Sequence, residues 1–102
     1  MPTRRMLRHG LVVSDTPTQI TLDGDPVHVA AARLGAGPNA QHIVEFWAEG
    51  SIEDTGTERT RTFQVIGTGH ALPDGARHWG TTDRTPEGLV WHLYELPEST
   101  AR

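Results

Sequence analysis

The stretch ERTRTFQVIGTGH, Glu58–His70, decides the fold of this chain. From residue 60 to residue 66, β-branched and aromatic residues recur at alternate positions, which is the period of a β-strand with two unlike faces. This period places Phe63 and Val65 on one face, and we assign that face to the core. Ile66 falls on the opposite face, which indicates that this side is also partly covered. The stretch therefore predicts a central strand of a sheet.

The same strand runs into Gly67-Thr68-Gly69. Glycine at the end of a strand permits a positive φ, a bulge or a tight bend. We expect a bulge or bend here rather than a phosphate-binding loop, because a dinucleotide fingerprint needs a third glycine and a following helix. His70 is then placed just past the end of a central strand.

Six further segments have strand-like patterns, and turn signals rich in Gly, Pro and Asp separate them; they span residues 4–13, 19–22, 27–34, 41–49, 77–82 and 89–96. Helical periodicity is weak throughout. Short strands at this spacing favour an all-β fold, either a small antiparallel β-sandwich or a partly closed β-barrel of about seven strands. We expect one domain over 1–102, with an ordered core of about 4–96 and a polar C-terminal tail at 97–102.

Two expectations concern pairing. The last segment, LVWHLYEL, is apolar on both faces, so it is predicted to be interior to a sheet. Segments 41–49 and 59–67 are predicted to form a hairpin with a long acidic loop between them, which carries Glu53 and Asp54.

Composition excludes several classes of function. The chain has 102 residues, a net charge of −4 and a pI of about 5.8, which argues against a general binder of nucleic acid or anionic membrane. It has no cysteine, so disulfides and thiolate chemistry are excluded. The N-terminal segment lacks the apolar core of a signal peptide, and no segment is long and apolar enough to span a membrane. We expect a soluble protein in the cytoplasm.

The pattern RTFQVIGTGHALPDG, followed by a short strand and a C-terminal LVWHLYE, resembles a family of small uncharacterised proteins of tailed bacteriophages and prophages. The resemblance covers mainly Thr57 to Glu95. It implies an accessory phage protein in the cytoplasm of a bacterial host, and it implies no catalytic residue. All nine basic Lys/Arg residues are arginine, and Ala, Gly and Thr are abundant, which indicates a GC-rich genome and fits an actinobacterial host.

Histidines and carboxylates offer only weak signals of chemistry. His70, His78 and His92 lack the HxH or HExxH spacing of known metal sites, so we expect no metal and no cofactor. Asp74 or Asp83 paired with a histidine would make an acid–base pair, but Asp74 lies in Pro-Asp-Gly, where aspartate forms turns. No serine has a nucleophile context. We expect the protein not to be an enzyme.

Binding sites remain as the main functional hypotheses. A ligand or partner site near the GTGH turn would use five residues: Thr68, His70, Arg77, Trp79 and His92. Trp47 and Trp79, if they face outward, would mark an aromatic protein interface. The basic start at Arg4, Arg5 and Arg8 and the acidic stretch from Glu45 to Glu58 form an asymmetry that can steer a protein partner.

The leading hypothesis is a non-enzymatic accessory bacteriophage protein that binds a host or phage protein. The alternatives are a small-molecule or nucleotide-binding β module with its site near the GTGH turn, and a minor virion or assembly component. Self-association through unpaired edge strands is a further hypothesis.

Overall fold

The computed structural model describes residues 4–35, 37, 40–52, 56 and 58–98. Within these ranges the chain forms seven strands: β1 (Arg4–Val12), β2 (Thr18–Leu22), β3 (Pro26–Leu34), β4 (Gln41–Ser51), β5 (Arg59–Gly67), β6 (Arg77–Thr81) and β7 (Trp91–Leu96). The predicted all-β fold is confirmed. The described part of the chain contains no helix that could span a membrane. Residues 53–55 and 57 of the predicted acidic loop, and 99–102 of the predicted tail, lie outside the described residues.

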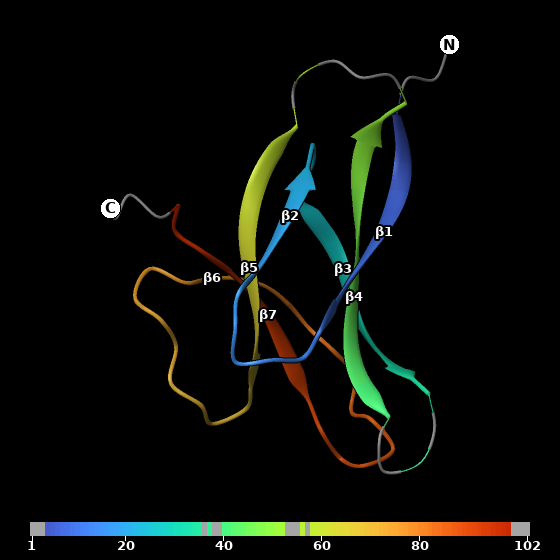
Figure 1. The fold of residues 1–102 in the computed structure, drawn as a ribbon, viewed down its shortest axis with the longest axis vertical. Coiled ribbons are helices and arrows are strands. Elements are labelled where there is room, and N and C mark those ends of the chain that lie inside the picture. Colours follow the sequence, from blue (N-terminus) through green and yellow to red (C-terminus); the bar gives the residue numbers. More distant parts are fainter. Residues whose placement is uncertain (1–3, 36, 38–39, 53–55, 57, 99–102) are drawn as a thin grey trace.

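The strands form two antiparallel sheets that pack as a sandwich and do not close into a barrel (Figure 1). One sheet has the order β1-β4-β3, and the other has the order β2-β5-β7-β6. The stretch Glu58–His70 contains β5, which is an interior strand between β2 and β7. β7 is also interior, between β5 and β6, as its two apolar faces predict.

The predicted hairpin between segments 41–49 and 59–67 is wrong. These segments are β4 and β5, and they lie in different sheets. β4 pairs with β1 and β3, whereas β5 pairs with β2 and β7. The connection between them passes from one sheet to the other. A polar loop has the same composition whether it turns within a sheet or crosses between two sheets, so composition could not distinguish the two cases.

The core lies between the sheets and is centred on one aromatic pair. Phe46 of β4 and Phe63 of β5 are both fully buried, and their ring centroids are 5.3 Å apart across the sandwich. Val65 lies on the same face of β5 as Phe63 and is also buried, as the alternation predicts. Burial of side chains of this size stabilises a domain by about 1.5–3 kcal/mol each. Ile66, on the outer face of β5, is buried as well, so that face is also partly covered.

The two sheets approach each other most closely where β3 meets β6. A Cβ atom at Gly80 of β6 would lie 2.4 Å from Cγ2 of Val29 in β3. The absence of a side chain at Gly80 is therefore what permits this approach. A register shift between His78 and Gly80 accompanies it.

The basic start and the acidic stretch of the sequence pair with each other. β1 lies antiparallel beside β4, with Arg4 opposite Ser51 and Arg8 opposite Trp47. Arg4 forms ion pairs with Asp23 and Glu49, and Arg8 forms one with Glu45. Much of the charge asymmetry seen in the sequence is thus neutralised within the domain. The asymmetry therefore contributes less to the electric field that a partner protein would meet.

The glycine-rich end of β5 forms a tight turn and not a bulge. The backbone N–H of His70 donates to the carbonyl of Gly67 at 3.2 Å, and Gly69 has a φ of 90°. This is the geometry of a type II turn, whose third position requires a positive φ and therefore favours glycine. The turn points the chain away from the sheet immediately after His70.

Candidate functional site

Four hydroxyl and imidazole groups form a continuous hydrogen-bond chain on the outer face of the β2-β5-β7-β6 sheet. His92 of β7 contacts the Thr68 hydroxyl through Nε2 at 2.8 Å and the Thr81 hydroxyl through Nδ1 at 2.9 Å. The Thr81 hydroxyl also contacts Nε2 of His78 at 2.8 Å. A threonine hydroxyl has one proton to donate, so the tautomers of the two imidazoles are coupled. His92 is half-buried, and these partners are all side-chain hydroxyls.

A cluster of charged side chains lies on the opposite, inner face of the same sheet. Arg61 of β5 donates from Nε and Nη2 to the two carboxylate oxygens of Glu95 in β7, at 2.8 and 2.7 Å. The indole N–H of Trp79 donates to the same carboxylate at 2.9 Å. The side chain of Arg61 is only 6% exposed, and its Nη1 forms an ion pair with Asp25 at 2.9 Å. This bidentate geometry is the strongest form of the arginine–carboxylate interaction.

The electrostatics of the cluster follow from these contacts. The hydrogen bond from Arg61 is the largest influence that lowers the pKa of Glu95, and the N–H of Trp79 lowers it further. The hydrogen bond to Glu95 in turn raises the pKa of Arg61. Both groups are therefore charged over the ordinary pH range. Each charge is satisfied within the cluster, so removal of one partner would leave the other charge buried and unpaired.

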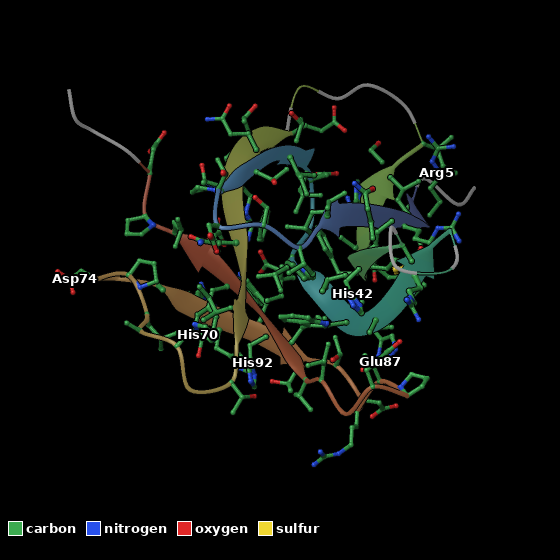
Figure 2. The ribbon with its side chains drawn as sticks, turned by 60° about the horizontal axis from the view of Figure 1, so that its bottom comes forward. Arg5, His42, His70, Asp74, Glu87 and His92 are labelled. Carbon is green, nitrogen blue, oxygen red and sulfur yellow. The ribbon has the colours of Figure 1, made fainter. Side chains whose placement is uncertain are left out.

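The structure divides the five residues predicted near the GTGH turn into three places. Thr68 and His92 are hydrogen-bonded on the outer face. Trp79 turns toward the core and packs against it, and the guanidinium of Arg77 lies 4.3 Å from the centroid of its ring. His70 is exposed and lies at the end of β5, near the beginning of β7, where Figure 2 labels both His70 and His92.

His70 lines a groove of about 560 Å³ beside the end of β5, which we call the His70 groove. Its lining includes Asp15, Gln64 and Trp91. A Cβ at Gly67 would lie 3.1 Å from the His70 ring and 3.4 Å from Cζ3 of Trp91, so the glycine leaves room for both rings. Cζ3 belongs to the six-membered ring of the indole, and that edge therefore faces the end of β5. The Trp91 N–H is buried without a hydrogen-bond partner among the described residues.

A second groove, of about 420 Å³, runs beside β3, and we call it the β3 groove. Six consecutive residues, 28–33, line one side, so the groove follows the edge of the strand and not only one of its faces. The β6–β7 connection lines the other side with residues 83–87. Arg33 of β3 and Glu87 of this connection form an ion pair, and Figure 2 labels Glu87 together with His42, which also lines the groove.

The outer face of the β1-β4-β3 sheet, which we call the Trp47 face, carries apolar side chains interspersed with two ion pairs, Arg8 with Glu45 and Arg4 with Glu49. Its register places six apolar side chains on one side of the sheet: Met6, Val12, Ala30, Ala32, Ile43 and Trp47. Met6 is 51% exposed and Val12 is 43% exposed. Trp47 is half-buried at the centre, with the ring of His28 at 5.4 Å. The solvent-facing side of an antiparallel sheet is ordinarily polar, and here exposed apolar side chains share that side with ion pairs.

The metal-site and acid–base hypotheses concerned the histidines and aspartates. Among the described residues, no group of three or more His, Asp or Glu side chains is arranged to hold a metal ion. His78 and His92 contact hydroxyls and rings, and the aspartates proposed as their acid–base partners are not among these contacts.

Sequence analysis did not identify the Arg61–Glu95 cluster. A signal for it existed, because Arg61 shares the alternation of Phe63 and Val65, and Glu95 shares that of Leu93. A charged residue at an inward position requires a partner, since an unpaired buried charge is strongly unfavourable. Two inward charges of opposite sign on two interior strands therefore predict an ion pair.

The fold is a small all-β sandwich domain, and among the described residues it carries the His70 groove, the β3 groove and the Trp47 face. The chain belongs to a family described as a domain of unknown function, DUF7352, whose model matches residues 2–102. Searches of curated proteins and of solved structures returned no match.

Proposed function

We propose that this domain is a non-enzymatic accessory protein of tailed bacteriophages or prophages, and that it binds a host or phage protein in the cytoplasm of an actinobacterial host. The resemblance of Thr57–Glu95 to small phage proteins supports the phage assignment, and the arginine-only composition supports the host. The single observation that carries the binding role is the Trp47 face.

Three properties of the Trp47 face favour a protein partner. It carries exposed apolar side chains where solvent-facing sheet surfaces are ordinarily polar, and no described element of the chain covers it (Figure 1). Its centre is a tryptophan, the residue type most enriched among those that dominate binding energy. Its charged neighbours are already paired, Arg8 with Glu45 and Arg4 with Glu49, so a partner can cover the patch without burying an unpaired charge.

The test compares tagged wild-type protein with two variants in lysate of phage-infected actinobacterial cells. Trp47→Ala removes the centre of the patch. Leu72→Ala is the control, because Leu72 is 49% exposed and lies in the β5–β6 connection, away from the patch. We expect one protein to copurify at fixed stoichiometry with the wild type and Leu72→Ala, and its affinity to fall at least about tenfold with Trp47→Ala. Equal affinity of the purified partner for all three proteins would reject the assignment of the Trp47 face.

The His70 groove favours a second function, the binding of a small molecule such as a nucleoside. An indole edge, an imidazole and the carboxylate of Asp15 line a space of about 560 Å³, within the size range of ligand pockets. A flat ring could stack against the aromatic wall while its polar groups bond to Asp15 and His70. We expect a nucleoside panel to raise the melting temperature of the wild type and of an Asp74→Ala control but not of His70→Ala. Equal shifts in all three proteins, or none, would reject this site.

A further inference from the structure

The four edge strands of the sandwich are protected to different degrees. Unpaired edges promote unwanted pairing, and natural proteins protect them with short strands, bulges, prolines or charges. β2 and β6 are only five residues long, and β6 has a register shift. β1 has nine residues but carries Arg4, Arg5 and Arg8. Three of the four edges thus have an identifiable protection.

β3 has such features only near its ends, where Pro26 adjoins a register shift and Arg33 carries a charge. It is also nine residues long, and its register with β4 is regular after a shift between Pro26 and His28. From Val27 to Ala32 it has no arginine, carboxylate or proline. Three consecutive alanines, 30–32, leave space beside the backbone. The β3 groove runs along this stretch, so the unprotected edge faces a bounded space and not open solvent.

We propose that the β3 groove binds an extended segment of a partner protein, which adds to the β1-β4-β3 sheet as a fourth strand. Main-chain groups on the outer edge of β3 supply the hydrogen bonds, as in other cases of strand addition. The lined stretch of six residues, at roughly 3.3 Å per residue, accommodates a guest strand of about 20 Å. This inference rests on the edge of β3 and not on Trp47, although Ala30 and Ala32 adjoin both surfaces.

The walls of the groove define the chemistry of the guest. The described lining has two arginines, Arg33 and Arg84, and two carboxylates, Asp83 and Glu87, so its formal charge is balanced. Arg33 and Glu87 pair with each other near one end. The alanines of β3 offer apolar contacts and no charge. A guest with small, uncharged side chains fits this lining, because the lining is formally neutral and the stretch of β3 between His28 and Arg33 presents no charge to a guest.

The far wall favours a single extended segment over a second copy of the domain. The β6–β7 connection stands beside β3 in every copy. Pairing of two copies through β3 would have to accommodate two such connections, one from each copy, beside the same pair of strands. A lone peptide strand has no such obstruction.

The experiment selects peptides from a yeast-displayed library of random linear sequences of about ten residues, long enough to span the edge at roughly 3.3 Å per residue. Wild-type protein is the bait. The groove variant is Pro86→Trp, which places a large ring in the groove from an exposed loop position. The control is Pro17→Trp, the same change at an exposed position that lines neither groove.

We expect the wild type to enrich uncharged peptides with small side chains, and their affinity to fall about tenfold or more with Pro86→Trp but not with Pro17→Trp. Hydrogen exchange of the bound protein should slow at the β3 amides directed away from β4. Enrichment of the same peptides by Pro86→Trp, protection of amides outside β3, or no enrichment by the wild type would overturn the proposal. A wild-type dimer that Pro86→Trp dissociates would assign the edge to a second copy instead.

Discussion

Arg61 and Glu95 lie on adjacent strands, 34 positions apart in sequence, and their side chains meet in a bidentate ion pair between the sheets. The Arg61 side chain is 6% exposed and that of Glu95 is 20% exposed. The cluster also joins the two sheets, because Arg61 pairs with Asp25, which immediately precedes β3. Its members should therefore differ strongly in their contributions to stability, according to how far each is buried.

Removal of the carboxylate should be the most damaging single change in the cluster. Glu95→Ala leaves the buried Arg61 charge without its main partner, and we expect a loss of about 3–5 kcal/mol in the free energy of unfolding. Asp25→Asn should cost less than about 1 kcal/mol, because Asp25 is 60% exposed. Urea denaturation of the two variants measures the difference. Equal losses would contradict the central role of Glu95.

Acid should destabilise the domain partly through Glu95. Arg61 lowers the pKa of Glu95 in the folded state below its ordinary value of 4.5. The stability that this carboxylate contributes is therefore fully present above about pH 4.5 and is lost as the pH falls through the lowered pKa. We expect Glu95→Gln to be less stable than the wild type at pH 7, with the difference shrinking toward pH 3. Urea midpoints at pH 7, 5, 4 and 3 test this, and a constant difference would contradict it.

His9 should add a second pH dependence at higher pH. Its ring stacks on Phe46 at 5.2 Å, and burial lowers its pKa below the ordinary 6.5. The folded state thus favours the neutral imidazole, and stability should fall as the pH drops from above 6.5 toward the lowered pKa. His9→Leu should remove this component. Identical slopes for wild type and variant between pH 7.5 and pH 5.5 would show that His9 contributes nothing.

The close approach of β3 and β6 should depend on Gly80. Gly80→Ala puts a methyl group into Val29, and we expect a loss of about 1–3 kcal/mol from overpacking. Gly10→Ala is the matched control, because a Cβ there would meet Ile43 at an ordinary 3.5 Å. The double variant Gly80→Ala/Val29→Ala tests the cause, since it removes the 2.4 Å contact with Cγ2 and leaves only the milder 3.0 Å contact with Cβ of residue 29. Thermal and urea unfolding should show that Gly80→Ala costs less stability in the Val29→Ala background than in the wild type. An equal cost in the two backgrounds would show that the clash is not the reason for the loss.

The sequence predicted the strands better than their arrangement. The alternation in β5 identified Phe63 and Val65 as core residues because strand period is a local property of the chain. The assignment of β4 and β5 to one hairpin failed because pairing depends on which apolar faces meet across the sandwich. That information is distributed over all seven strands and is absent from the connecting loop.

The candidate site was less predictable than the fold, for the same reason. His92 and Thr68 were both selected from the sequence, but the hydroxyl of Thr81 that links His92 to His78 comes from a third strand. Trp79 was grouped with them because it is near in sequence, yet its ring lies on the opposite side of the sheet, and the register shift between His78 and Gly80 places Thr81 on the face of His92 instead. One irregular residue in a strand changes the face of every side chain that follows it.

The contact between Gly80 and Val29 also has a mechanical consequence. At this line the sheets cannot come closer, because Val29 already fills the space above Gly80. They cannot separate there without losing the nearest inter-sheet contact in the described structure. The distance between β3 and β6 should therefore vary little, and the two sheets should pivot about this contact. Fluctuations that change the volume of the core, and the first steps of unfolding, should open the opposite side of the sandwich, where β1 and β2 form the edges.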